Sequence, residues 1–243
     1  MQETAIDVKD LCVSYRIMKR QSIRNIFSKN KKTQIKHFTA VKNVTFSLEK
    51  GSIMGIVGKN GSGKSTMLNT IAGIFAPDSG SIDLHGNSIS LLSIGVGFQV
   101  NLSGRDNILL SGMMLGFSKR EVMDKMEEII TFSELGSFID APVRTYSSGM
   151  YSKLAFSITA ILETDIMLID EVLSVGDARF KKKSYAKMKE LISDSNRTVL
   201  IVSHSNDTLE ELCDCLMWLH EGEVKMFGET KQVLDAYKEY SSR

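Results

Sequence analysis

The chain has 243 residues, of which 42% are hydrophobic and 24% charged, as in an ordinary globular protein that can bury a substantial core. Its formal net charge of +1 excludes a global electrostatic attraction to nucleic acid or membrane. No stretch approaches the ~18 apolar residues of a membrane span, and the polar N-terminus argues against a signal peptide. Three cysteines without metal-ligand spacing favour a reducing cytosol: Cys12, Cys213 and Cys215.

The first part of the chain has the pattern of strands followed by a glycine-rich loop. Alternating hydrophobicity predicts a strand that ends at Tyr15 and a second strand across residues 41–48. A short apolar run at 53–57 leads into the loop, and a helix is expected from Lys64 to about Ile74. The segment Pro77-Asp78-Ser79-Gly80 has the composition of a turn.

The second part of the chain is predicted to be largely helical at first. From roughly Arg105 to Ala160, apolar residues recur at three- and four-residue spacings. Two further strands are expected to end at Asp170 and Ser203, with a charged helix over about 180–193 between them and a last helix over about 231–240. The order predicts an α/β core with a helical insertion.

The glycine-rich loop, Gly58-Lys59-Asn60-Gly61-Ser62-Gly63-Lys64-Ser65, is a complete G-x-x-x-x-G-K-S phosphate loop. Its glycines let backbone N–H groups wrap phosphate oxygens at the positive end of the following helix. Lys64 is expected to neutralise the β and γ oxygens and the Ser65 hydroxyl to bind Mg²⁺. The flanking strand and helix make a chance turn the weaker interpretation. The expected nucleotide contacts are Gly58, Asn60, Gly61, Ser62, Gly63, Lys64, Ser65 and Thr66.

Two carboxylates follow a later apolar run, Ile166-Met167-Leu168-Ile169. Asp170 is placed to hold Mg²⁺ through water, and Glu171 to polarise the attacking water as a general base. Taken alone, such a pair is more often a strand end that reaches solvent. The phosphate loop earlier in the chain favours the catalytic interpretation.

A small-residue cluster, Ser147-Ser148-Gly149, stands at the expected start of a helix. Small residues there leave backbone N–H groups and hydroxyls open toward an anion. A simple helix cap is the plain alternative. With the phosphate loop, the Asp170-Glu171 strand and His204 after a later strand, the cluster resembles the nucleotide-binding subunit of an ABC transporter, over nearly the whole chain.

This resemblance implies a fold and a second set of site residues. The fold is a P-loop NTPase of the RecA-like α/β class, with an N-terminal antiparallel β subdomain and a helical subdomain at about 100–160, in a single domain over 1–243. The usual signature is Leu-Ser-Gly-Gly-Gln, and residues 146–150 depart from it at the first, third and fifth positions. Ser147 and Gly149, which face the nucleotide of the opposite subunit in the family, are kept.

By the same resemblance, Gln99 is the glutamine that senses Mg²⁺ and couples the site to a membrane partner. Asp177 belongs to a loop that crosses the dimer interface, and His204 contacts the γ-phosphate. An aromatic ring ahead of the phosphate loop usually holds adenine; Tyr15 is the first candidate and Phe38 the second.

Three segments look like the branch that exports cell-surface polysaccharides: 102–108, 145–151 and 170–177. Tyr-Ser-Ser-Gly-Met in place of the common signature is characteristic of that branch, whereas Gln99 keeps the general residue where branch members commonly show histidine. The predicted function is an ATP hydrolase that uses ATP and Mg²⁺ to drive export of a lipid-linked polysaccharide, of teichoic-acid or O-antigen type. Some branch members carry a further glycan-binding domain, so the chain is expected to be a short member or a truncated one.

The implied partners are a second copy of the subunit and a separate multi-span permease, at the cytoplasmic face of a bacterial membrane, with no nucleic acid. The alternative is an ABC ATPase of the translation or DNA-repair type. Translation types normally join two cassettes in one chain, and repair types place a long coiled coil between phosphate loop and signature; neither pattern is present here.

Residues 16–37 form an unusual basic segment, with eight Lys or Arg residues and no acidic one. Interspersed apolar residues give it a partly amphipathic pattern. One interpretation is an interfacial helix in contact with anionic lipid, where each cation contributes about 1 kcal/mol. The other is a solvated hairpin loop.

Overall fold

The computed structural model describes residues 3–18, 35–92, 97–170, 177–194, 196–203 and 205–241. The strands in these residues are β1 Thr4–Met18, β2 Ile35–Glu49, β3 Ile53–Val57, β4 Ser79–Asp83, β5 Ile89–Leu92, β6 Ile166–Asp170, β7 Thr198–Val202, β8 Cys215–His220 and β9 Glu223–Glu229. The helices are α1 Lys64–Ile71, α2 Gly104–Met114, α3 Lys119–Ser133, α4 Ser148–Ile161, α5 Ala178–Ile192, α6 Asn206–Leu212 and α7 Thr230–Ser241, with 3-10 helices η2 Gly136–Asp140 and η3 Val143–Thr145 between α3 and α4.

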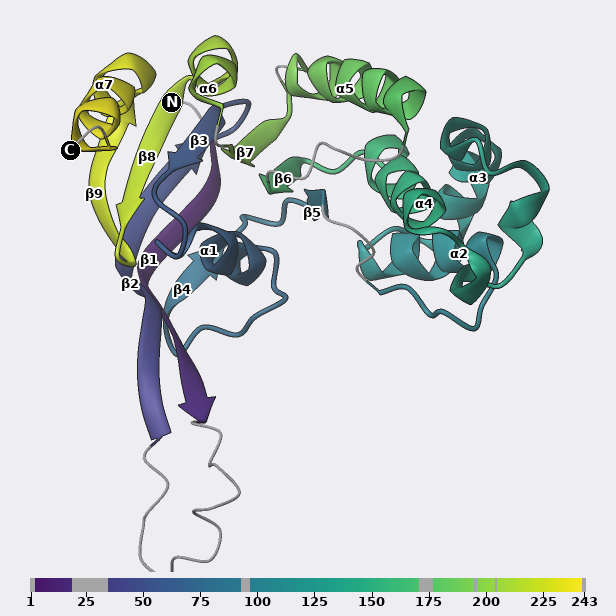
Figure 1. The fold of residues 1–243 in the computed structure, drawn as a ribbon, viewed down its shortest axis with the longest axis horizontal. Coiled ribbons are helices and arrows are strands. Elements are labelled where there is room, and N and C mark those ends of the chain that lie inside the picture. The colour runs from purple at the N-terminus through teal and green to yellow at the C-terminus, as the bar shows by residue number, and fades with distance from the viewer. Residues whose placement is uncertain are drawn as a thin grey trace, which may run out of the picture.

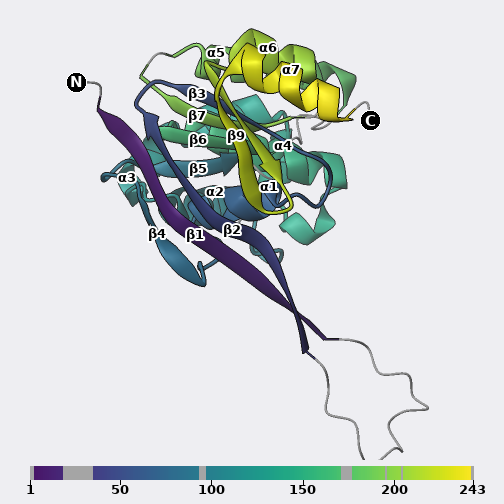
Figure 2. The same cartoon turned by 90° about the vertical axis from the view of Figure 1, so that its left-hand side faces the viewer.

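The N-terminal sheet has three antiparallel strands in the order β2-β1-β4. Residues such as Ile6 and Val8 of β1 are buried on the core side, as their alternation predicts. Figure 2 shows β1 and β2 running side by side as a long pair that extends beyond the body of the protein. The expected antiparallel β subdomain is therefore confirmed.

Two local predictions in this sheet are wrong. β1 does not end at Tyr15 but continues to Met18, so residues 16–18 and 35–37 of the predicted basic insertion belong to paired strands or their ends. Ser79 and Gly80, predicted as part of a turn, begin β4. At Gly80, which has φ +89°, a Cβ atom would collide with the backbone of β1, so the absence of a side chain lets β4 pair there.

The second sheet has six strands in the order β5-β6-β7-β3-β8-β9. All neighbouring pairs are parallel except β8 and β9. In β6, Ile166 and Leu168 join the hydrophobic cluster on one face, whereas Met167 and Ile169 join the cluster on the other. A strand that is buried on both faces has apolar residues at successive positions, which explains the continuous apolar run of β6.

The described residues form three hydrophobic clusters. The first lies between the two sheets and includes α1, the second covers the opposite face of the six-stranded sheet with α5 and α7, and the third is internal to α2, α3 and α4. Figure 1 shows the helices of the third cluster at one end of the molecule, away from β8, β9 and α7. Phe156 of α4 belongs to the second cluster and Leu154 to the third, so α4 joins the helical part to the core.

The α/β fold is confirmed, with helix and strand ends shifted by a few residues from their predicted positions. α1 stops at Ile71 rather than about Ile74, and β7 stops at Val202 rather than Ser203. Four elements have no counterpart among the predicted ones: β5, β8, β9 and α6. Among the described residues, none of the helices combines the length and the hydropathy that a membrane crossing demands.

Candidate nucleotide-binding site

The phosphate loop joins the end of β3 to the start of α1, the strand–loop–helix context that the motif requires. Gly63 has φ +105°, and a Cβ atom there would fall on the carbonyl oxygen of Ala40 in β2. Gly58 is equally enclosed by the backbone of Leu219 in β8. Both positions therefore require glycine, because the loop is folded tightly against two strands.

The loop surrounds a cavity of about 200 Å³ with a cation at its wall. Lys64 is 7% exposed, and its Nζ donates to the carbonyl oxygens of Gly58 at 2.6 Å and Lys59 at 3.2 Å. Gly63 is the N-cap of α1 and has no side chain, so the backbone at the start of the helix faces the loop as in a phosphate-binding helix terminus. The cavity is lined by Phe38, Ala40, Asn60, Gly61, Gly63, Lys64, Ser65, Thr66 and Val202.

A second observation at the loop also fits a bound phosphate group. The hydroxyl of Ser62 is buried and has no hydrogen-bond partner within the part of the chain that the structure describes. The backbone of Ser62 is held on both sides, because its N–H donates to Lys59 and its carbonyl accepts from Gly222. The loop is thus preformed, with polar groups that a nucleotide phosphate would satisfy.

The sheet register brings Asp170 to the same edge as the phosphate loop. Ile56 of β3 pairs with Val202 of β7, and Val202 pairs with Asp170 of β6, so these three residues lie in one row. Ser65 is exposed at the start of α1, on the loop that follows β3. A hydroxyl and a carboxylate at one sheet edge are oxygen ligands of the kind that Mg²⁺ prefers, so the residues fit this ion.

Both aromatic candidates lie beside the loop. Tyr15 and Phe38 are opposite each other in the β1–β2 pair, which places their side chains on the same face. The Tyr15 hydroxyl donates to Thr66 Oγ1 at 3.1 Å, and the exposed Phe38 ring lines the cavity. The two residues therefore lie together beside the phosphate loop, and the prediction that one of them stacks on adenine stays a prediction.

Gln99 stands on a segment anchored by a residue that the sequence analysis did not single out. Asn107 of α2 is fully buried, and its Oδ1 accepts from the Gln99 N–H at 2.7 Å. Its Nδ2 donates to the carbonyl oxygens of Gln99 at 3.0 Å and Ser103 at 2.8 Å. A sequence signal was present, since Ser103-x-x-Asp106 forms a capping box that begins α2 here.

The signature cluster opens α4, as predicted. Ser147 is the N-cap, and its Oγ accepts from the Met150 N–H at 3.2 Å. Ser148 is exposed, and a Cβ added at Gly149 would have, among the described residues, only the Ser147 Oγ within 4 Å, at 3.9 Å. None of Gln99, Ser147, Ser148, Gly149 and Asp177 lines the phosphate-loop cavity.

Asp177 is the N-cap of α5 and does not line the phosphate-loop cavity. Its Oδ1 accepts from the N–H groups of Arg179 and Phe180, each at 3.0 Å, and its Oδ2 accepts from Lys153 at 2.7 Å. Hydrogen bonding to Lys153, followed by the Phe180 N–H, lowers the pKa of Asp177 to about 2. Glu171, His204 and residues 19–34 of the basic segment lie outside the described residues, and the predictions made for them stay predictions.

Comparison with known proteins agrees with this geometry. The ABC transporter family matches residues 41–174, more than half of the chain. The O-antigen export system ATP-binding protein RfbB of Klebsiella pneumoniae is 41% identical over 83% of this chain and 82% of its own length. RfbB of Myxococcus xanthus is 42% identical over 97% of this chain, and the teichoic acids export ATP-binding protein TagH of Lactococcus lactis is 44% identical over 91%.

Solved structures confirm the fold. The ATP-binding subunit of an ABC transporter superposes with a TM-score of 0.73 at 23% identity, covering 97% of this chain and 94% of its own. The dimeric, post-hydrolysis cassette MJ0796 bound to ADP and phosphate gives a TM-score of 0.69 at 20% identity, covering 93% and 98%.

The fold and the phosphate loop define a P-loop nucleotide-binding protein. Within that class, the chain belongs to the ABC transporter family. The predicted resemblance to its polysaccharide-exporting branch is confirmed by the O-antigen and teichoic-acid relatives. The chain spans 56% of the Myxococcus xanthus relative and 47% of the Lactococcus lactis relative.

Proposed function

We propose that the chain is the ATP-hydrolysing subunit of an ABC exporter that moves a lipid-linked cell-surface polysaccharide, of O-antigen or teichoic-acid type, across the cytoplasmic membrane. The observation that carries the proposal is the preformed phosphate loop, with Lys64 at the wall of its cavity, in a chain whose relatives are ATP-binding proteins of O-antigen and teichoic-acid export. The subunit acts at the cytoplasmic face of the membrane.

The chain's own residues perform the binding steps. Lys64 exchanges its bonds to the loop carbonyls for the β and γ oxygens of ATP, and the N–H groups of the first turn of α1 bind the same phosphates. Ser65, and Asp170 through water, would hold Mg²⁺, which would supply positive charge to the phosphate oxygens. Glu171 takes a proton from the attacking water, and His204 contacts the γ-phosphate.

The active form is a head-to-tail dimer. Support comes from the exposed Ser147, Ser148 and their neighbour Gly149, which lie apart from the cavity of their own chain and are open to a ligand. Each of these clusters completes the site on the phosphate loop of the other subunit, so that ATP joins the two copies and hydrolysis lets them separate.

The dimer works on a separate permease. Next to Gln99, Phe98 lines an apolar cavity of about 580 Å³ between residues 72–74, β5, α2 and α4, with Ile74 and Met114 exposed at its edge. The buried Asn107 side chain binds the Gln99 backbone through its N–H and its carbonyl oxygen. The Gln99 segment is therefore fixed to α2 of the helical part. This arrangement supports transfer of the opening motion through the Gln99 segment to the membrane subunit.

The first test concerns ATP hydrolysis. The purified chain is expected to release phosphate from ATP in the presence of Mg²⁺, and Lys64→Ala is expected to lower kcat by two to three orders of magnitude, on the scale of losing one preorganised charge contact. Asn196→Ala, a substitution in the exposed turn before β7, is the matched control and leaves the rate unchanged. Full activity of Lys64→Ala would contradict the assignment of the site.

The second test concerns transport. A Glu171→Gln variant, expected to hold ATP without turnover, is used to capture partners from native membranes. Recovery of a multi-span protein together with polyprenyl-linked glycan supports export and identifies the polymer class. Recovery of ribosomes or DNA without a membrane protein would favour the translation or repair type of ABC ATPase.

A third test concerns lipid contact by the basic segment. Neutralising Lys29, Lys31 and Lys32 tests this contact in a vesicle-binding assay.

A further inference from the structure

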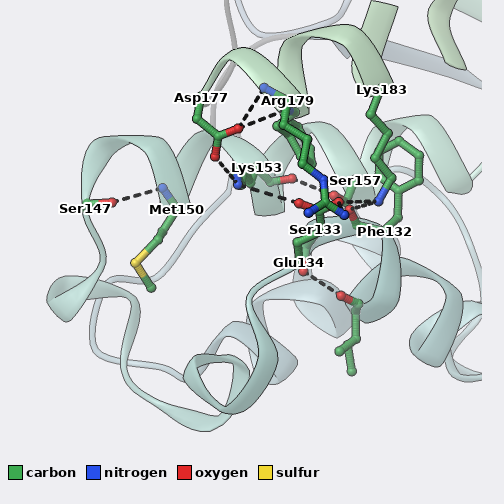
Figure 3. A network of polar contacts seen from close by, with 12 residues as sticks. Phe132, Ser133, Glu134, Ser147, Met150, Lys153, Ser157, Asp177, Arg179 and Lys183 are labelled. Atoms are coloured by element: carbon green, nitrogen blue, oxygen red, sulfur yellow. Dashed lines mark hydrogen bonds and ion pairs between the residues drawn. The ribbon is translucent and has the colours of Figure 1, made fainter. Parts of the chain in front are cut away.

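Lys153 of α4 lies where three segments of the chain meet. Its Nζ is 2.7 Å from Asp177 Oδ2 at the start of α5 and 3.9 Å from Glu134 Oε2 at the end of α3. The ring of Phe180 lies 5.1 Å from the same Nζ. Figure 3 shows Lys153 close to Asp177, with Glu134 nearby. Lys153 is one helical turn beyond Gly149, so it belongs to the helix that the signature cluster begins.

The surroundings hold the Lys153 ammonium in one place. The side chain is only 14% exposed, whereas that of Asp177 is 60% exposed. Glu134, which ends α3 with φ +56°, also accepts from Lys183 Nζ at 3.1 Å. Lys183 in turn donates to the Phe132 carbonyl at 2.9 Å. Two lysines therefore share one carboxylate, but only Lys153 reaches Asp177.

Asp177 divides its two tasks between its two oxygens. Oδ1 caps the first turn of α5 through two N–H groups, and Oδ2 binds Lys153. The residue is also the first described one after residues 171–176, which follow Asp170 at the end of β6. The described residues that flank Glu171 in the sequence are thus Asp170, at the end of β6, and Asp177, which is bound to Lys153 of α4.

We propose that Lys153 is a positioning residue for hydrolysis, which through Asp177 links the helix of the signature cluster to the segment that carries Glu171. The inference rests on the proposed function. In the head-to-tail dimer, the signature cluster of a subunit contacts the partner's nucleotide while Glu171 serves its own. The Lys153–Asp177 pair therefore connects the two nucleotide sites: a shift of α4 on binding the partner's nucleotide alters the anchor of the catalytic segment.

If Lys153 and Asp177 only stabilised the fold, their loss would change the stability of the protein rather than its turnover. A pair with one largely exposed partner contributes little to folding. Loss of the pair is therefore expected to appear in turnover rather than in the thermal midpoint or in ATP affinity. Mutations in such coupling contacts change coupling by amounts that correspond to about 2- to 30-fold in a rate.

The test uses variants of the full chain in steady-state ATP hydrolysis. Asp177→Asn keeps the cap through Oδ1 but presents an amide NH₂ to the Lys153 ammonium, so it removes only the pair. Asp177→Asn and Lys153→Met are each expected to lower kcat about tenfold, with KM for ATP within about twofold of wild type. Lys153→Arg is expected to restore most of the rate. Lys183→Met, which touches Glu134 but not Asp177, is the matched control and keeps the wild-type kcat.

The double variant Lys153→Met/Asp177→Asn supplies the decisive comparison. If the two residues act through one contact, the double variant loses about tenfold, like each single variant. A loss of about a hundredfold would mean independent effects and would overturn the proposal, as would a wild-type kcat in Asp177→Asn. If Lys153→Met fails to fold, Asp177→Asn alone carries the test. Absence of hydrolysis in the wild-type chain would instead refute the proposed function.

Discussion

The ammonium group of Lys59 lies over the ring of Tyr240, with Nζ 4.5 Å from the ring centroid. Lys59 is the second residue of the phosphate loop, and Tyr240 is in the last turn of α7. Tyr240 also packs on Trp218, with ring centroids 5.1 Å apart, and Trp218 pairs with Val57 at the end of β3. The C-terminal helix is thus in direct contact with the nucleotide loop.

This contact predicts that Trp218, which is the single tryptophan of the chain, reports nucleotide binding. Lys64 must leave the carbonyl of Lys59 to bind phosphate, and Lys59 contacts Tyr240. Titration with ATP and Mg²⁺ is expected to change the tryptophan emission. Lys64→Ala should show no change, and Tyr240→Leu should show a much smaller one. A flat titration in a wild-type chain that retains labelled ATP on a filter would contradict the prediction.

The tight fold of the loop predicts a strong difference between two glycine substitutions. Gly63→Ala must place a Cβ on the Ala40 carbonyl at φ +105°, so it is expected to lower the free energy of unfolding by more than about 2 kcal/mol. Gly73→Ala has φ +74° but open space around the Cβ, and should cost only about 1 kcal/mol. Urea unfolding of both variants is the measurement; equal losses would show that the approach to Ala40 is unimportant.

Because the amide of Asn107 is buried and bonded to Gln99, we expect its loss to lower both the free energy of unfolding and the rate of ATP hydrolysis. Asn107→Leu leaves the N–H and C=O of Gln99 without their partner, which should lower the free energy of unfolding by about 2–3 kcal/mol. The same variant should also reduce ATP hydrolysis, because Gln99 loses its anchor. The exposed neighbour Asn101 provides the control, and Asn101→Ala should leave both quantities unchanged. An Asn107→Leu chain with wild-type stability would rule out this role.

The lowered pKa of Asp177 predicts a pH-dependent stability term. In the folded chain Lys153 and the Phe180 N–H lower this pKa from 3.8 to about 2, so folding favours the ionised carboxylate. The stabilisation is present in full above about pH 4 and is lost as the pH falls toward 2. It is small, because the side chain is largely exposed to solvent. The unfolding free energy of wild type minus that of Asp177→Asn should therefore shrink between pH 5 and pH 2; a constant difference would contradict this assignment.

The spacing of apolar residues predicted those helices and strands whose pattern is visible within their own sequence. The apolar run of β6 and the helical spacing of α3 and α4 were recognised because periodicity survives in one segment. The short strand β5 was not identified, since four residues carry little pattern. Tyr15 was predicted to end a strand, but β1 continues to Met18 because it pairs with β2. That pairing depends on a second strand that lies outside the local sequence of β1.

The sequence by itself determined the nucleotide chemistry. Residues 58–65 are contiguous, so the direction of their N–H groups, the place of Lys64 and the start of α1 follow from local backbone preferences. The capping role of Ser147 is local for the same reason.

Only the tertiary structure decided which distant residues meet. Asp170 reaches the edge of the phosphate loop because β7 lies between β6 and β3. Lys153 meets Asp177 because α4 packs against α5, and Lys59 meets Tyr240 because α7 packs on β8 beside the phosphate loop. Contacts of this kind depend on strand order and helix packing. Each short segment contributes only a small part of the free energy that decides them.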